Sequence, residues 1–246
     1  MLSPDRGDEV LDDADPEEDE APSPEPVHEP PPVPDRRLRI LELALVLAVA
    51  FLGSIIYSMY LWWIGQPLSP SATLDEVHRI LDSATSIALL AYVLHRQGRS
   101  LERIGLTARL SDLPLTVLLG FFSALLTGSL GQLMAPFLHG RKTVPESSPG
   151  LLHWLAVIPG AAKEELIVRA FLITEVSELT GSEGLAVLAS VGLQTLYHTY
   201  QGTASALYAA GGFLVASVFY AGTRRITPVI LVHAMHNFWV LGGSGR

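Results

Sequence analysis

Charged side chains interrupt a long apolar stretch in the second half of the chain. The segment AAKEELIVRAFLI, residues 161–173, carries Glu164, Glu165 and Arg169 among mostly apolar residues. An ionisable group inside a membrane span raises the free energy of insertion by at least about 2.5–3.5 kcal/mol, so each one is expected to have a partner or a function. Glu165 and Arg169 are four residues apart on a helix and can pair. Glu164 then has no partner within its own helix, and such a carboxylate can act as a general base.

Two later apolar segments carry polar groups that could act together with these carboxylates. His198 ends the run SVGLQTLYHTYQG, and His233 and Asn237 lie four residues apart in VILVHAMHNFWV. Residues at this spacing share one helix face, so His233 and Asn237 can reach the same group. Packing and hydrogen bonds between helices are the structural alternative for all three side chains.

Together these residues offer two routes to the hydrolysis of an amide bond. In the first, a Glu and a His deprotonate a water molecule, while a His and an Asn donate hydrogen bonds to the oxyanion that forms. In the second, two His and one Glu bind Zn²⁺, and a second Glu acts as the base. The HExxH motif of soluble zinc proteases is absent, and the residues leave both routes open.

The elements that must position these side chains are long apolar segments. The chain is 49% hydrophobic and only 17% charged, against about 25% charged in ordinary globular proteins. A helix of about 20 apolar residues crosses the hydrocarbon core of a bilayer, and in lipid only a helix pairs all its backbone groups. We therefore predict an all-α, polytopic transmembrane bundle, with a soluble all-α protein as the competing class. About seven spans are expected, at 40–65, 77–95, 114–137, 151–174, 184–200, 203–221 and 226–242.

The N-terminal segment has a different composition from the rest of the chain. Residues 1–35 hold 13 of the 25 acidic residues and one of the 16 basic residues. We predict a disordered acidic and proline-rich tail over residues 1–37, because it has too few apolar side chains to form a core. The transmembrane domain then covers residues 38–246. The net charge of −9 belongs to the tail and gives no reason to expect a nucleic-acid partner.

Flanking residues predict how the chain is oriented. Three arginines precede the first span and tyrosines and tryptophans close it, which favours a cytoplasmic N-terminus and no cleaved signal peptide. Arginines in the loop 96–112 and at Arg224 would lie on the same side. Near the start of the second span, Arg79 and Asp82 are three residues apart and are expected to pair. The chain has no cysteine, which excludes disulfides and cysteine metal sites.

The order and spacing of these motifs resemble a known family. A sequence E-E-x-x-x-R, a helix that ends in His and a final helix with H-x-x-x-N resemble the CPBP family of intramembrane proteases, also called the CAAX-processing and bacteriocin-processing or Abi family. The match rests on EELIVR, LYHTYQG and HAMHN and covers roughly residues 100–242. The chain departs from the family at Gln194, where Phe is usual, and at Val168 and Ala170, where Phe and Gly are common.

The resemblance implies an intramembrane endopeptidase that hydrolyses peptide bonds near the membrane face. By carry-over, Glu164 and His198 activate the water molecule. His233 and Asn237 form the oxyanion site. The implied partners are a peptide or membrane-protein substrate and membrane lipid, and the implied location is the plasma (inner) membrane.

The remaining implied roles concern support and metal. Glu165 and Arg169 would be supporting residues of the catalytic site. Members of the family have been described both as metalloproteases and as glutamate proteases. The cofactor is therefore either Zn²⁺, held by Glu164, His198 and His233, or none.

Two other functional classes stay open. The same bundle could be a non-catalytic immunity or scaffold protein that binds a peptide, and Gln194 in the second motif favours this class. Intramembrane Glu and His residues also form the proton relays of transporters. The sequence shows no internal repeat of the kind that many transporters have.

Overall fold

The described part of the chain is helical throughout. The computed structural model describes residues 35–64, 72–135 and 151–243, and within these ranges it contains helices and turns but no strand. The all-α prediction is confirmed. The predicted tail lies outside the described residues up to position 34, and its last two residues already belong to the first helix.

Two long helical segments contain a wider, π-helical turn. In chain order the elements are α1 (Arg36–Leu47), η1 (Ala48–Leu52), α2 (Gly53–Ile64), α3 (Ala72–Arg96), α4 (Asp112–Met134), α5 (Leu151–Glu164), η2 (Glu165–Phe171), α6 (Leu172–Thr180), α7 (Glu183–Tyr197), η3 (Thr199–Gln201), α8 (Thr203–Thr223) and α9 (Thr227–Gly243). The segments η1 and η2 are π-helical, and η3 is a 3₁₀ turn. Both α1–η1–α2 and α5–η2–α6 therefore run as continuous helices.

Four helices of the described chain are long and apolar enough to cross a membrane. They are Arg36–Ile64, Glu76–Arg96, Asp112–Leu133 and Thr203–Thr223, which correspond to the first, second, third and sixth expected spans. The other three expected spans are also helical. However, α5–η2–α6 carries several charges near its centre, and α7 and α9 have 15 and 17 residues, or about 23 and 26 Å at 1.5 Å per residue. The number of seven spans stays a prediction.

Exposed apolar side chains identify surfaces that suit lipid. Helix α4 packs on α8 and α9, yet Val117 and Phe121 on it are 68% and 61% exposed. Trp63, near the end of α2, is 81% exposed. Large apolar side chains repeated along a helix would be unfavourable in water. With four helices able to span a bilayer, these surfaces indicate an integral membrane protein.

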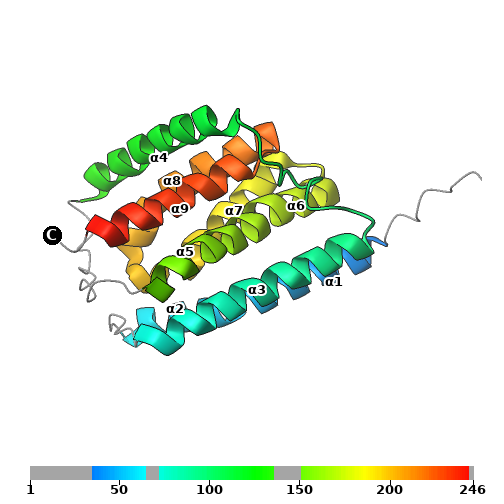
Figure 1. The fold of residues 1–246 in the computed structure, drawn as a ribbon, viewed down its shortest axis with the longest axis horizontal. Helices are drawn as coiled ribbons and strands as arrows, with labels where there is room; N and C mark the ends of the chain where they lie inside the picture. Colours follow the sequence, from blue (N-terminus) through cyan, green and yellow to red (C-terminus); the bar gives the residue numbers. More distant parts are fainter. Residues whose placement is uncertain (1–34, 65–71, 136–150, 244–246) are drawn as a thin grey trace, which may run out of the picture. The chain divides into compact units, whose positions relative to one another are not determined.

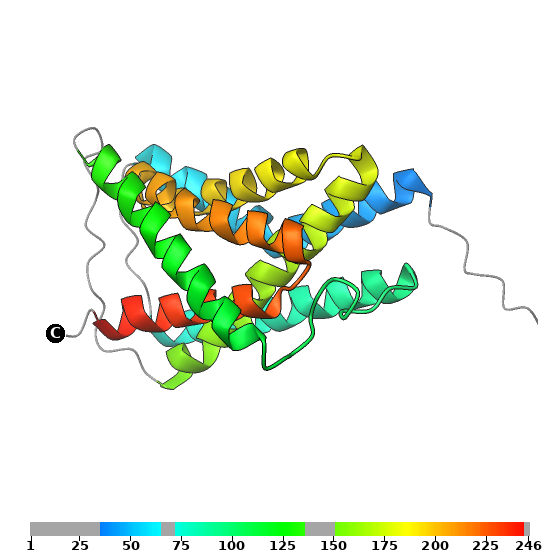
Figure 2. The same cartoon turned by 90° about the horizontal axis from the view of Figure 1, so that it is seen from above.

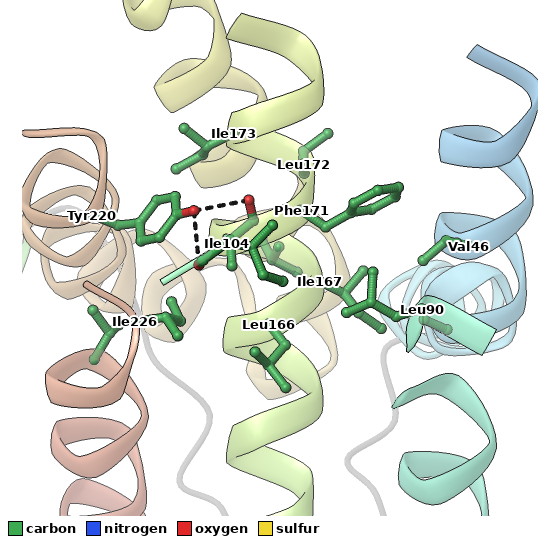
Figure 3. Packing of buried hydrophobic residues seen from close by; sticks show 14 of the residues in the cluster. Val46, Leu90, Ile104, Leu166, Ile167, Phe171, Leu172, Ile173, Tyr220 and Ile226 are labelled. Carbon is green, nitrogen blue, oxygen red and sulfur yellow. Dashed lines mark hydrogen bonds between the residues drawn. The ribbon is translucent and has the colours of Figure 1, made fainter. Parts of the chain in front are cut away.

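The helix α5–η2–α6 lies at the centre of the described bundle. It has α1 and α3 on one side and α8 and α9 on the other (Figure 1), and Figure 2 shows it running obliquely from the side of α3 and α9 toward the side of α7 and α8. All seven residues of η2 are buried. Figure 3 shows this segment between Val46 and Leu90 on one side and Tyr220 and Ile226 on the other. Glu165 and Arg169 of the first motif therefore lie in a segment that is packed on both sides.

Arginines and glutamates from separate elements meet at one end of the bundle. Arg39 of α1 and Arg99 of the loop after α3 each lie 2.8 Å from a carboxylate oxygen of Glu175, and both also bind Glu178. Burial raises the pKa of Glu175, and the two arginines offset this only in part. Burial also acts to raise the pKa of Glu178, but the arginines outweigh it and the pKa is lowered. This end carries the segments predicted to be cytoplasmic.

The expected ion pair between Arg79 and Asp82 is wrong. Arg79 lies 3.3 Å from Glu76, one turn earlier, and Asp82 pairs with Lys163 of α5. Lys163 is only 7% exposed, and its ammonium group also lies 5.1 Å from the centre of the Phe51 ring. A buried ammonium group needs a nearby carboxylate more than the half-exposed Arg79 does. The contact joins α3 to α5 beside the first motif.

Candidate active site

Glu165 and Arg169 form a buried ion pair at the start of η2. Arg169 Nη1 donates to Glu165 Oε1 at 3.3 Å, and Arg169 Nε lies 3.1 Å from Glu165 Oε2. The two residues are 2% and 1% exposed. The ion pair expected from their spacing is confirmed. It lies in a π-helical turn, a local distortion that is frequent at functional sites.

Glu165 also binds the third motif. His233 of α9 places Nδ1 2.6 Å from Glu165 Oε1, so this carboxylate is shared between His233 and Arg169. Because a carboxylate accepts hydrogen bonds, Nδ1 carries the proton and Nε2 is the nitrogen left for a substrate. A carboxylate that orients an imidazole in this way also stabilises its protonated form.

Glu164 has a different set of partners from Glu165. Its Oε2 accepts a hydrogen bond from the Tyr197 hydroxyl at 2.8 Å and from Gln194 Nε2 at 3.4 Å. Oε1 accepts no hydrogen bond from the described residues. The carboxylate is half-buried and lies close enough to His198 and His233 to interact with both rings. One oxygen of Glu164 is therefore committed to α7, while the other is available.

His198 is held at the C-terminal end of α7. Its Nδ1 lies 2.9 Å from the carbonyl oxygen of Gln194 and must donate to it, so Nε2 is again the free nitrogen. The ring packs against Tyr197 and Phe213, with centroid distances of 4.6 and 5.0 Å. The Arg169 guanidinium group lies over the same Phe213 ring, 5.4 Å from its centre. The second motif thus meets the first across α8.

Tyr197 is a site residue that sequence reasoning missed. Its ring stacks on Phe51 of η1 at 4.8 Å, and its carbonyl oxygen accepts from the Ser58 hydroxyl at 2.7 Å. The signal in the sequence was a tyrosine beside His198, on the same helix as the polar residues Gln194 and Thr195. A buried tyrosine usually has a partner for its hydroxyl group, and here that partner is Glu164.

Asn237 lies apart from these contacts. It follows His233 by one turn of α9 and is half-buried, but its side chain makes no hydrogen bond to the described residues. The stacked rings of Trp154 and Phe238, 5.1 Å apart, join α5 to α9 next to it. The structure therefore connects five of the six expected site residues and leaves Asn237 on the neighbouring turn.

The expected zinc ligands Glu164, His198 and His233 are not gathered into a metal site in this arrangement. No group of three His, Asp or Glu side chains in the described ranges lies close enough together to hold one. The Nδ1 atoms of His198 and His233 and the Oε2 atom of Glu164 are all engaged in hydrogen bonds. What the arrangement offers chemically is one carboxylate oxygen and two imidazole nitrogens that have no hydrogen-bond partner among the described residues.

Comparisons with known proteins identify the segment that carries these residues. Residues 146–239 match the family described as type II CAAX prenyl endopeptidase, Rce1-like. No curated protein and no solved structure matches the chain. The matched segment contains all six expected site residues and agrees with the resemblance drawn from the three motifs.

Proposed function

We propose that this chain is an intramembrane endopeptidase, because its residues 146–239 match the family of Rce1-like type II CAAX prenyl endopeptidases. Its substrate is a peptide or a membrane protein, cleaved near the membrane face. The cell compartment we propose is the plasma (inner) membrane, with a cytoplasmic N-terminus.

The observation that carries this proposal is the convergence of three distant motifs. Glu165 contacts His233 across 68 positions of the chain, and Glu164 contacts Tyr197 across 33. A packing role alone would require neither two adjacent carboxylates nor imidazoles with free nitrogens. Ionisable side chains that gather in this way are typical of catalytic sites.

In the proposed reaction, Glu164 and His198 activate a water molecule. The free Oε1 of Glu164 or Nε2 of His198 accepts a proton from the water, and the water oxygen attacks the carbonyl carbon of the substrate peptide bond. When the tetrahedral intermediate collapses, the carbon–nitrogen bond breaks and the proton passes to the leaving amine. One water molecule is consumed for each bond cleaved.

His233 and Asn237 are proposed to stabilise the oxyanion of the intermediate. With Nδ1 bound to Glu165, the His233 ring can donate from Nε2 only as an imidazolium, and the Glu165 carboxylate favours that form. Arg169 balances the charge of Glu165 and fixes its position. Asn237 would supply a second donor from the next turn of α9.

Metal-dependent hydrolysis remains the second proposal for the mechanism. It would use Glu164, His198 and His233 as ligands, through the carboxylate oxygen and the imidazole nitrogens that are not hydrogen-bonded, and it requires these three side chains to come closer together than they lie here. For this reason the steps above use protein groups alone. Metal content and chelator sensitivity distinguish the two routes.

The test uses purified full-length protein in detergent with a panel of fluorogenic peptides, including a prenylated CAAX peptide and its unprenylated form. Glu164→Gln and His198→Ala are expected to lower kcat by at least about a hundredfold, because each removes a group from the transition state. Glu178→Gln is the matched control, since Glu178 lies on the same continuous helix but outside the site. It should retain wild-type activity.

The same preparation is assayed with and without a strong chelator, and bound metal is counted. Cleavage that survives chelation but is lost in Glu164→Gln supports the metal-free route. Cleavage lost on chelation, with about one metal per chain, supports the metal route. Full activity in Glu164→Gln or His198→Ala would refute the proposed site, and a folded wild type that cleaves no peptide would favour the non-catalytic alternative.

A further inference from the structure

We propose that Gln194 and Tyr197 are positioning residues that hold one oxygen of Glu164 so that the other faces the attacking water. This inference rests on the proposed function and names residues outside its catalytic set. Gln194 stands where Phe is usual in similar proteins. Its amide group can donate a hydrogen bond to Glu164, which a Phe side chain cannot do.

The geometry assigns both donors to the same atom. Tyr197 donates to Glu164 Oε2 at 2.8 Å and Gln194 Nε2 donates to it at 3.4 Å, whereas Oε1 has no partner in the described residues. Two donors on one oxygen restrict rotation of the carboxylate. The oxygen that is left has the more available lone pairs and can accept the proton of water.

The hydrogen bond from its amide group explains why a glutamine is buried at position 194 better than packing does. Gln194 is fully buried, and its Oε1 has no hydrogen-bond partner in the described structure. A buried polar atom without a partner costs free energy that an apolar side chain would avoid. The opposite amide orientation would place Oε1 against a carboxylate oxygen, which is repulsive. The Nε2 donor to Glu164 is the compensating contact.

Tyr197 is held rigidly enough to position another group. The residue is only 4% exposed, its ring is stacked on Phe51, and its carbonyl oxygen is bound by Ser58. Both supports come from the helix α1–η1–α2. The hydroxyl therefore has little freedom to follow Glu164 and instead constrains it.

Other charged groups near Glu164 do not replace these donors. Lys163, its neighbour in α5, is paired with Asp82, and His233 is bound to Glu165. His198 donates through Nδ1 to the Gln194 carbonyl oxygen. Gln194 thus contacts both water-activating residues, one through its side chain and the other through its backbone.

The first test separates kcat from KM. Tyr197→Phe keeps the ring stack and removes only the hydroxyl group, and it is expected to lower kcat about 10- to 100-fold with KM within about twofold, as for loss of a hydrogen bond to a charged group. Gln194→Met should lower kcat by a smaller factor, because its contact is longer. Tyr220→Phe is the matched control, since it removes a buried hydroxyl bound to Ile104 and Ala170, away from Glu164.

The second test does not depend on catalysis. Thermal melting in detergent is measured for Tyr197→Phe, Glu164→Leu and the double variant. Tyr197→Phe should lower the Tm of the wild type but not that of Glu164→Leu, because the acceptor is then already absent. Tyr220→Phe should lower the Tm equally in both backgrounds.

The outcomes separate this inference from the proposed function. An equal Tm shift for Tyr197→Phe in both backgrounds would overturn the contact, and a kcat unchanged in Tyr197→Phe would overturn its positioning role while the endopeptidase proposal stands. If Tyr220→Phe lowers kcat as much as Tyr197→Phe, the effect is general destabilisation and the inference fails. A wild type without peptidase activity refutes the proposed function, and the positioning role with it, even if the Tm values show coupling.

Discussion

Replacement of Arg169 by Met tests how the buried charges at the centre of the bundle are balanced. Arg169 and Glu165 are 1% and 2% exposed, and Met has a similar length without the charge. In Arg169→Met, the Glu165 carboxylate stays buried with His233 as its remaining partner. The cost is that of an incompletely compensated charge in a medium of low polarity.

The burial of both side chains places this effect in the range known for buried ion pairs. Removing one partner of a buried ion pair costs about 3–5 kcal/mol, because the other charge is left behind. At about 1.4 kcal/mol per power of ten, the folding equilibrium falls by roughly two to four powers of ten. If the charge is removed from both sides, in Glu165→Leu with Arg169→Met, most of this loss should be recovered. Activity should not recover, because His233 then has no acceptor for Nδ1.

The assay is reversible unfolding in mixed micelles, with peptidase activity measured on the same samples. Arg79→Met is the matched control: Arg79 also belongs to an ion pair, with Glu76, but its side chain is 52% exposed. Its loss should cost at most about 1 kcal/mol. The reasoning is refuted if Arg169→Met is as stable as Arg79→Met, or if the double variant is no more stable than Arg169→Met alone.

Three further predictions follow from other contacts. Ser58→Ala leaves the buried carbonyl oxygen of Tyr197 without its donor, so unfolding should become easier by about 1–3 kcal/mol and kcat should fall. Gly105→Ala should lower the Tm more than Gly181→Ala, although both have positive φ, because a Cβ at Gly105 would lie 2.1 Å from a backbone oxygen and one at Gly181 would meet nothing; equal Tm values would contradict this. The pKa of Glu178 is lower in the folded protein, so its stabilising contribution is complete above its ordinary pKa of 4.5 and is lost as the pH falls through the lower folded value. Glu178→Gln should therefore flatten the acid side of a plot of Tm against pH, and an unchanged plot would argue against the effect.

Local contacts could be predicted from the sequence because they depend on helix geometry alone. The pair Glu165–Arg169 follows from a spacing of four residues. The helical character of the segments that bear the motifs follows from their apolar composition. The position of His198 at the end of a helix was also evident, since polar and glycine residues follow it.

Contacts between helices could not be predicted in the same way. Spacing indicated that Arg79 would pair with Asp82, but Asp82 binds Lys163, which is 81 positions away. Gln194 looked like a departure that weakened the site, because its partner Glu164 lies on another helix. The π-helical turns are also invisible to a pattern of 3.6 residues, since they depend on how the helix is packed.

The stacking of Tyr197 on Phe51, and the hydrogen bond that its carbonyl oxygen accepts from Ser58, bear on the order in which the helices assemble during synthesis. Both supports belong to the helix α1–η1–α2, which precedes the family segment 146–239 in the chain. Chains emerge from the ribosome N-terminus first, so this helix can be in the bilayer before Glu164 and His198 are made. It would then act as a template on which the later helices assemble their site, and a fragment cut at the family boundary would lack that template.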